Sequence, residues 1–201
     1  MNRVSSFVKQ AEESGHDSIT VSERNGMTLM CLSDGAGGMG GGLVASRLFS
    51  DLANEIDALV ELNSPLDFES LLRKVDLEIS SNPEAGEATG IIAIIRNGIV
   101  FGASVGDSQC WLYEPDFEYE LSKLQNRKPL LGSGLAVPVG FGPTEISGSL
   151  LLASDGLFNY VRDPEIKSGI RLGAEGLVNL AEKAIGYLQD DCSVIIYRAE
   201  V

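Results

Sequence analysis

The chain has 201 residues, with 15 Lys and Arg against 29 Asp and Glu, so its formal net charge is −14. Hydrophobic residues make up 44% and charged residues 22%, which is typical of a water-soluble globular protein and predicts a single domain over residues 1–201. The negative charge and the lack of any Lys/Arg cluster argue against nucleic acid as a partner.

Segments that would direct the chain to a membrane or out of the cell are not found in the sequence. No apolar run approaches the ~18–20 residues of a membrane-spanning helix, and the N-terminal stretch lacks the apolar core of a secretory signal. Three cysteines, far apart and in no CxxC pair, indicate core residues rather than disulfides or a zinc site: Cys31, Cys110 and Cys192. We therefore expect a cytoplasmic protein with no membrane partner. Its oligomeric state is not indicated.

The N-terminal half predicts a β-hairpin followed by two helices. Segments 17–22 and 27–33 are rich in β-formers, and the Asn25-Gly26 pair between them favours a hairpin turn. Helical spacing of apolar residues then begins after Gly42 with Val44, Leu48, Leu52, Ile56 and Leu59. A second amphipathic helix is expected over 66–79, with Phe68, Leu71, Leu72, Val75 and Ile79 on its apolar face.

The C-terminal half predicts mostly strands. Residues 90–105 and 108–121 are two β-rich runs, each broken by turn residues, and together they suggest an antiparallel meander of four strands. Residues 122–149, rich in Gly and Pro, are expected to be irregular loop. A strand at 149–154, a helix over 172–188 and a final strand at 192–198 follow. This order is not that of a doubly wound sheet and predicts an α+β fold, a four-layer αββα sandwich of two antiparallel sheets flanked by helices.

A glycine-rich stretch, DGAGGMGGG, begins at Asp34 between an expected strand and an expected helix. Its glycines satisfy the GxGxxG pattern of dinucleotide-binding proteins, and Glu55 stands about 20 residues further on. The match is weak because βαβ alternation is lacking and Asp34 would lie beside a bound pyrophosphate. No Lys follows the glycines, which excludes a P-loop. A tight turn that exposes the carbonyl of Gly35 explains the same glycines.

Aspartates stand at the ends of apolar runs at four places: Asp34, Asp107, Asp155 and Asp190. Each alone is compatible with an ordinary turn, but a buried carboxylate is costly unless it is paired or binds a metal. Carboxylate and carbonyl oxygens, such as those of Asp34 and Gly35, are the ligands of hard divalent cations. With almost no Cys or His in the chain, the four together predict a site for Mg²⁺ or Mn²⁺.

The order of these motifs resembles that of the metal-dependent type 2C (PPM) serine/threonine protein phosphatases over almost the whole chain. The matching segments are HDS at 16–18, LSDGAGG at 32–38, ATGIIAII at 88–95, VGDSQ at 105–109, LLASDGLFNYV at 151–161 and DDCSVIIYR at 190–198. Each motif is weak alone, and their collinear order carries the resemblance. It implies a short, bacterial-like phosphatase that hydrolyses phosphoserine and phosphothreonine in a phosphorylated protein partner, with a role in signalling.

The resemblance also implies a set of metal-site residues: Asp34, Gly35, Asp155, Asp190, Asp17 and Asp107. Asp34 would bridge two ions, with the Gly35 carbonyl completing one shell, and Asp155 and Asp190 would bind the other ion. Asp17 would hold metal-bound water, and Asp107 corresponds to a third, weaker position. Asp34 and Asp155 are therefore the expected catalytic residues, because two Mn²⁺ or Mg²⁺ ions can activate a water for in-line attack on phosphorus.

Several positions depart from the family pattern. Glu12 replaces an arginine that grips the substrate phosphate, Ala36 replaces a histidine proposed to protonate the leaving group, and Gln109 replaces an arginine. His16 replaces a glutamate, and it is open whether this histidine is a metal ligand, a general acid or a surface residue. The segment between residues 109 and 151 is short, which predicts a reduced flap beside the site.

These departures leave the substrate-binding residues and the role of Asp191 open. Arg3, Lys9 and Arg47 are candidate replacements for the missing positive charge. The departures from the family pattern also support an alternative function, a catalytically weak or inactive phosphatase-like module that binds or regulates a partner.

Overall fold

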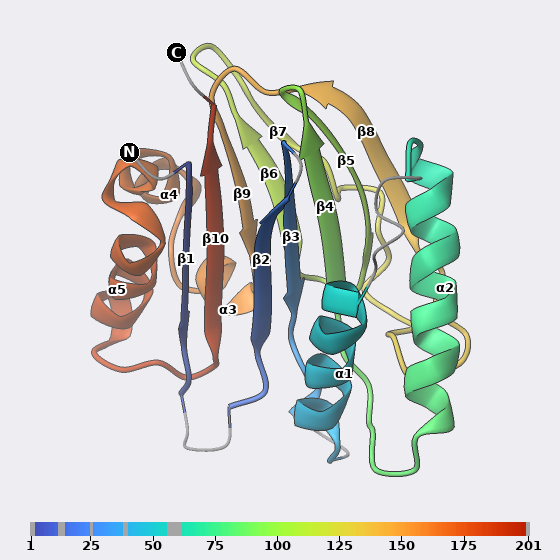
Figure 1. The fold of residues 1–201 in the computed structure, drawn as a ribbon. Coiled ribbons are helices and arrows are strands. Elements are labelled where there is room, and N and C mark those ends of the chain that lie inside the picture. The colour runs from blue at the N-terminus through green and yellow to red at the C-terminus, as the bar shows by residue number, and fades with distance from the viewer. Residues whose placement is uncertain (1–2, 12–14, 25, 38–39, 56–61, 200–201) are drawn as a thin grey trace.

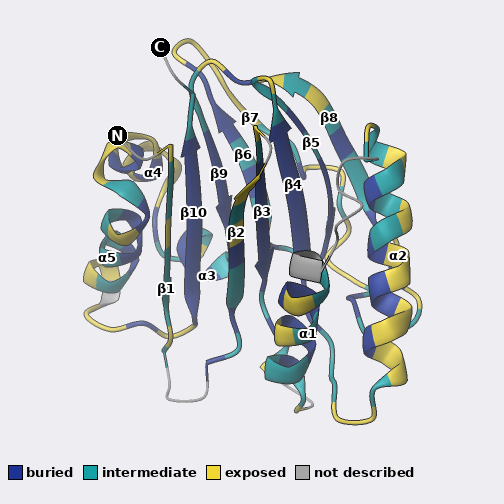
Figure 2. Ribbon diagram, in the orientation of Figure 1, coloured by how far each residue is buried: buried dark blue, intermediate teal, exposed yellow. Residues whose placement is uncertain are grey.

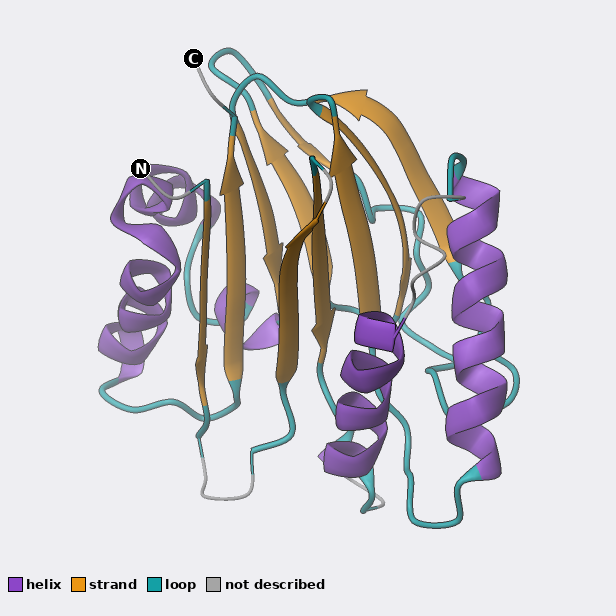
Figure 3. Cartoon of the chain, in the orientation of Figure 1, coloured by secondary structure: helices purple, strands orange, loops and turns teal. Residues whose placement is uncertain are grey.

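The computed structural model describes residues 3–11, 15–24, 26–37, 40–55 and 62–199. Two five-stranded sheets pack face to face, and helices cover the outer face of each sheet (Figures 1 and 3). Every strand pairing is antiparallel. The expected α+β arrangement, an αββα sandwich, is confirmed.

The first sheet has the strand order β1-β10-β9-β6-β7. Its strands are β1 (Val4–Lys9), β10 (Cys192–Arg198), β9 (Ser149–Ala153), β6 (Gln109–Tyr113) and β7 (Glu118–Glu120). The second sheet has the order β2-β3-β4-β5-β8. Its strands are β2 (Ser18–Arg24), β3 (Met27–Ser33), β4 (Gly90–Arg96), β5 (Ile99–Val105) and β8 (Val139–Glu145). The expected hairpin is β2–β3, with Ile19 opposite Leu32.

The helices form the two outer layers. Helices α1 (Gly42–Glu55) and α2 (Pro65–Ser81) pack on the second sheet. The first sheet carries α3 (Asp155–Phe158), α4 (Asp163–Gly169), a 3₁₀ turn (Ile170–Leu172) and α5 (Gly173–Ile185). The three expected helices are therefore present, although the expected helical positions Ile56 and Leu59 lie outside the described residues. No helix of the described part is long and apolar enough to cross a membrane.

Both faces of the central strands are buried, which explains the continuous apolar runs of β4, β9 and β10 (Figure 2). Successive side chains of a strand point to opposite faces. In β4, Ile91 and Ile95 therefore pack between the two sheets, while Ile92 and Ile94 pack under α1 and α2. Alternating polar residues would leave one of these two apolar layers incomplete.

The expected four-strand meander is wrong. The hairpins β4–β5 and β6–β7 exist, but β5 pairs with β8 and β6 pairs with β9 in the other sheet. The chain crosses between the sheets after Val105, where Gly106 has a left-handed φ of 92°. Turn residues and alternation are local signals, so they predicted each hairpin without showing which strand it joins next.

The expectation of irregular loop over 122–149 is also wrong in part, because β8 lies within it. Its sequence, VGFGPTE, contains two glycines and a proline, which are typical of loops, and it therefore does not indicate a strand. Pro is tolerated in β8 because the strand lies at the edge of its sheet. Strand β1, which is short and lies at the edge of the other sheet, was not expected either.

Candidate active site

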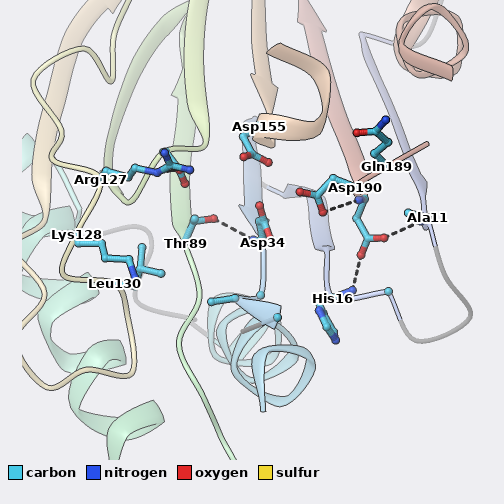
Figure 4. Close-up of a pocket in the computed structure, with 16 residues that line it drawn as sticks. Ala11, His16, Asp34, Thr89, Arg127, Lys128, Leu130, Asp155, Gln189 and Asp190 are labelled. Carbon is cyan, nitrogen blue, oxygen red and sulfur yellow. Dashed lines mark hydrogen bonds and ion pairs between the residues drawn. The ribbon is translucent and has the colours of Figure 1, made fainter. Parts of the chain in front are cut away.

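Four of the expected metal ligands meet at one end of the sandwich. Asp34 follows β3, Asp107 lies between β5 and β6, Asp155 follows β9, and Asp190 precedes β10. All four line one cavity of about 470 Å³, as does Gly35 (Figure 4). The cavity therefore collects carboxylates from the strand ends of both sheets, and its size is that of a small-molecule site.

The backbone of Asp34 is fixed by Thr89, the residue immediately before β4. The amide of Asp34 donates to Thr89 Oγ1 at 2.9 Å, and the amide of Thr89 donates to the Asp34 carbonyl at 2.8 Å. Thr89 Oγ1 is also hydrogen-bonded to Ser108 Oγ at 2.7 Å, which ties in the residue next to Asp107. With its backbone held, the carboxylate of Asp34 points into the cavity toward Asp155 (Figure 4).

Each Asp-Gly pair has a glycine because another backbone segment lies against it. A Cβ on Gly35 would collide with the carbonyl oxygen of Gly42, at the start of α1. A Cβ on Gly156 would collide with the carbonyl oxygen of Asp191. These close approaches bring α1 next to Asp34 and the start of β10 next to Asp155, so the glycines are structurally required at both ends of the cavity.

Asp191 holds the segment before β2 in place. Its Oδ1 accepts from the amide of Ala11 at 2.7 Å, and its Oδ2 accepts from the amides of His16 and Asp17, the latter at 3.2 Å. Gly35 also donates its amide to the His16 carbonyl at 3.2 Å. The role that the sequence left open for Asp191 is therefore structural, because it positions the backbone that carries Asp17.

Burial and the repulsion of neighbouring carboxylates raise the pKa values of two cavity residues, Asp34 and Asp155. Burial, followed by the charges of Asp17, Asp155, Asp190 and Asp107, raises the pKa of Asp34 to about 9. Burial raises the pKa of Asp155 as well, with further contributions from Asp190 and Asp107. In the absence of a cation, the folded state therefore binds the protons of Asp34 and Asp155 more tightly than an exposed aspartate would.

Asp17 is 6% exposed and lies close enough for its charge to act on Asp34. Burial raises its pKa to about 7, and the nearby hydroxyls of Ser193 and Ser154 offset part of the rise although neither has the geometry of a hydrogen bond to Asp17. Both carboxylate oxygens of Asp17 and Oδ1 of Asp155 are buried without a hydrogen-bond partner in the described part of the chain. Such atoms are costly, and each needs a proton or a cation.

The donor set fits a hard divalent cation, since it consists of carboxylate oxygens and the Gly35 carbonyl. A bound cation would satisfy the orphaned oxygens and reverse the rise in pKa. Within the ranges that the structure describes, however, no three His, Cys, Asp or Glu side chains are already grouped as a metal site requires. The structure thus brings five of the six expected residues, all except Asp17, to the lining of one cavity, without fixing which oxygens would ligate.

The positive charge at the cavity comes from residues that sequence reasoning missed. Among the described lining residues the Lys and Arg side chains are those of Arg127 and Lys128, and they do not include Arg3, Lys9 or Arg47. Arg127 Nε lies 2.5 Å from Asp107 Oδ2. Both cations lie in the stretch expected to be irregular loop, where no sequence pattern marked them. Glu12 lies outside the described residues.

Two alternatives for individual residues can be judged from the structure. The ring of His16 is turned away from the labelled carboxylates in Figure 4, while its backbone amide donates a hydrogen bond to Asp191.

The GxGxxG stretch lies between β3 and α1, but β3 pairs antiparallel with β2 and β4. The parallel βαβ unit that a dinucleotide fingerprint needs is therefore not formed around this turn.

Comparison with known proteins shows the fold. No model of a known protein family and no curated protein matches the sequence. Solved structures match almost end to end. A bacterial serine phosphatase has a TM-score of 0.84 at 21% identity, covering 98% of this chain and 97% of that one. Serine/threonine phosphatase Stp1 from Staphylococcus aureus has a TM-score of 0.80 at 19% identity, covering 100% and 96%.

A third structure of this kind contains metal. The catalytic domain of the serine/threonine protein phosphatase PstP, in complex with 2 manganese ions, has a TM-score of 0.82 at 20% identity, covering 98% of this chain and 97% of that one. The chain therefore has the fold of the bacterial serine/threonine phosphatases, as its motif order suggested.

Proposed function

We propose that the protein is a metal-dependent serine/threonine protein phosphatase that uses Mn²⁺ or Mg²⁺. The observation that carries this proposal is the meeting of four strand-end aspartates from two sheets in one cavity, where Oδ1 of Asp155 is buried without a hydrogen-bond partner in the described part of the chain. The shared fold with bacterial serine/threonine phosphatases supports the same activity. Its substrate would be a phosphorylated protein in the cytoplasm, within a signalling system.

Each cavity carboxylate has a proposed role. Asp34 would bridge two cations, the Gly35 carbonyl would contribute to one of them, and Asp155 and Asp190 would bind the other. Bound Mg²⁺ or Mn²⁺ would supply Lewis-acid charge for transfer of the phosphoryl group to water. Asp34 and Asp155 are thus the proposed catalytic residues. The backbone hydrogen bonds of Asp34 to Thr89 support its role, because they fix the backbone that carries the carboxylate before any ligand arrives.

Two further aspartates would act at the edge of this centre. Asp17 donates a hydrogen bond from its backbone amide to Asp191, and its two carboxylate oxygens, which have no hydrogen-bond partner among the described residues, would face the shell around the cations. Asp107, paired with Arg127, is the proposed ligand of a third, weaker cation. Binding there would require the Arg127 guanidinium to give up its contact with Oδ2.

The products would be inorganic phosphate and the free hydroxyl of serine or threonine. Ala36 offers no acid for the leaving alkoxide, and the His16 ring is turned away from the carboxylates. The proton on the product hydroxyl would therefore come from water. We also propose that residues 1–201 form one phosphatase domain, in which the segment between β7 and β8 is a reduced flap that leaves the cavity open to protein substrates.

A phosphatase-like binding module is the second candidate function. It is favoured by the position of His16, whose ring does not reach toward the carboxylates where the resembling family has an acidic side chain. The two candidates differ in turnover and not in fold. Both predict cation binding at the cavity.

Hydrolysis of para-nitrophenyl phosphate with Mn²⁺, with Mg²⁺ and with EDTA tests the proposal. We expect turnover only with metal, and near-complete loss in Asp34→Asn and Asp155→Asn proteins that remain folded. Asp116→Asn, an exposed aspartate in the β6–β7 turn, is the matched control and should keep full activity. Full activity of either cavity variant would refute the proposal. Tight Mn²⁺ binding without turnover of this ester or of phosphopeptides would favour the binding module.

A further inference from the structure

The cavity is strongly acidic, yet the proposed substrate is an anion. Five aspartates contribute to its lining: Asp34, Asp107, Asp155, Asp190 and Asp191. The carboxylates offset the positive charge of the cations that would bind there. A phosphate monoester that enters the cavity therefore needs additional positive charge. In the described lining, Arg127 and Lys128 are the basic side chains that can supply this charge.

The geometry of Arg127 fits a phosphate-binding group. Its Nε contacts Asp107 Oδ2 at 2.5 Å, and its side chain is 76% exposed. No hydrogen bond of either Nη is found within the described ranges, so the outer edge of the guanidinium is open to a ligand. This planar fork matches two oxygens of a phosphate, whereas a lysine offers a point charge.

Arg127 also acts on one of the proposed catalytic carboxylates, that of Asp155. It extends toward the cavity from the side of Lys128 and Leu130 (Figure 4). Its charge lowers the pKa of Asp155, against the larger opposing effect of burial. Because the charge of Arg127 acts on Asp155, its guanidinium lies near the position where we expect the phosphoryl group, between the aspartates and solvent.

The segment that carries Arg127 is anchored to the same backbone as Asp34. Leu131 and Ala88 exchange two amide hydrogen bonds of 3.0 Å, and Ala88 forms a further bridge with Gly35. Beyond Leu131, Asp76 of α2 accepts from the amides of Gly132 at 2.8 Å, Gly134 at 3.0 Å and Ala136 at 3.0 Å. Arg127 therefore lies a few residues from a fixed point, which lowers the cost of ordering it around a ligand.

We propose that Arg127 binds the phosphate of the phosphorylated substrate and that Asp107 positions its guanidinium. While Asp107 holds no cation, Nε stays with Asp107, and the two Nη groups donate to two oxygens of the phosphate. Lys128 adds charge without the directional fork. This proposal rests on the proposed phosphatase function, because it assigns the anion that enters the same cavity.

The test measures phosphate binding and turnover separately. Inorganic phosphate is titrated into the Mg²⁺-loaded protein and followed by calorimetry, and KM and kcat are measured on a phosphothreonine peptide. Arg127→Ala should raise the phosphate Kd and the peptide KM by roughly tenfold or more, as expected for a lost charged hydrogen bond. Its kcat should fall much less. Arg127→Lys should recover only part of the loss.

The matched control is Arg162→Ala. Arg162 is also an exposed arginine, 84% exposed, whose Nε pairs with Glu165 at 3.1 Å, but it does not belong to the described cavity lining. It should change neither the phosphate Kd nor the peptide KM. Circular dichroism and thermal unfolding would verify that the Arg127 variants remain folded.

The outcomes separate this inference from the proposed function. A wild-type protein that turns over the peptide, together with an Arg127→Ala variant of unchanged phosphate Kd and KM, would overturn the role of Arg127 and leave the phosphatase intact. Phosphate binding that depends on Arg127 without any turnover would support the phosphate site and refute the phosphatase. A wild-type protein that neither binds phosphate nor hydrolyses the peptide would overturn both.

Discussion

Two buried carboxylates of this protein have opposite surroundings. Asp76, where α2 meets the segment after Leu131, is 3% exposed and accepts hydrogen bonds from three backbone amides. Asp17, whose charge acts on Asp34 although Asp17 is not among the described lining residues of the cavity, is 6% exposed. Within the described chain neither of its oxygens accepts a hydrogen bond. The same residue type is buried to the same extent in both regions, yet one is satisfied by the protein and the other is not.

The difference separates anchors from candidate ligands. A carboxylate that receives backbone amides stabilises the fold, whereas one without partners costs stability unless a cation or proton arrives. Position alone does not decide this, because Asp191 lies at the cavity and is an anchor, with the amides of Ala11, His16 and Asp17 on its oxygens. The hydrogen-bond partners of each aspartate are therefore better guides to function than its place in a motif.

The largest expected effect is the loss of activity in Asp34→Asn. Removing a charge that would hold two cations should lower kcat/KM on the order of 10³-fold. This corresponds to a loss of several kcal/mol of transition-state stabilisation. The fold should be retained, because the backbone of Asp34 is held by Thr89 independently of the carboxylate. Steady-state kinetics beside urea unfolding measures both quantities. A variant that loses stability in parallel with activity would place Asp34 among the anchors.

Asp76→Ala should show the opposite pattern. It leaves three backbone amides without their acceptor and should lower the free energy of unfolding by roughly 2 to 4 kcal/mol. The exposed Glu78 on the same helix provides a control, since Glu78→Gln should change it by less than about 0.5 kcal/mol. Urea unfolding measures the loss. Wild-type stability in Asp76→Ala would contradict the role of Asp76 as an anchor.

The dependence of stability on pH should distinguish the two regions in the metal-free protein. Asp17 and Asp34 have pKa values raised from 3.8 to about 7 and about 9, so the folded state binds their protons more tightly than the unfolded state does. Their contribution to stability is complete below pH 4 and is lost as pH rises through 7 and 9.

Asp34→Asn removes one of these groups, so in EDTA at pH 9 it should be more stable than the wild type, by at least about 1 kcal/mol. The advantage should shrink toward pH 5 and should disappear when Mn²⁺ stabilises the wild type. Urea unfolding at both pH values, with and without metal, measures it. If the stability advantage of Asp34→Asn is the same at both pH values, it does not come from titration of the Asp34 carboxyl.

The sequence predicted the parts of the site that depend on local pattern. The Asn25-Gly26 hairpin, the two helices after Gly42 and the Asp-Gly pairs at strand ends are all encoded within a few residues. Because a cavity at the end of a sandwich gathers strand ends, the aspartates at 34, 107, 155 and 190 could be expected to meet once the sheets pack.

The parts that the sequence did not predict depend on contacts far along the chain. The pairing of β6 with β9, the amides that satisfy Asp191 and the approach of Arg127 to Asp107 each join segments that no local pattern relates. Asp76 did leave a signal, because it interrupts the apolar face of α2 beside Val75 and Ile79. A buried charge on an apolar face requires partners, but the sequence does not say which segment supplies them.

Asp107 is an intermediate case between anchor and ligand, and it gives the smallest expected effect. Its partner is the side chain of Arg127, which can leave, whereas the amides on Asp76 cannot. If Asp107 binds the third cation, Arg127→Ala should tighten Mn²⁺ binding at the weakest site by about two- to fivefold, the value of an exposed ion pair. Asp107→Asn should abolish that site, and Arg162→Ala should leave it unchanged. Calorimetric titration with Mn²⁺ measures the affinity of all three variants. Weaker Mn²⁺ binding in Arg127→Ala would contradict competition between Arg127 and the cation for Asp107, because the guanidinium would then favour cation binding instead of opposing it.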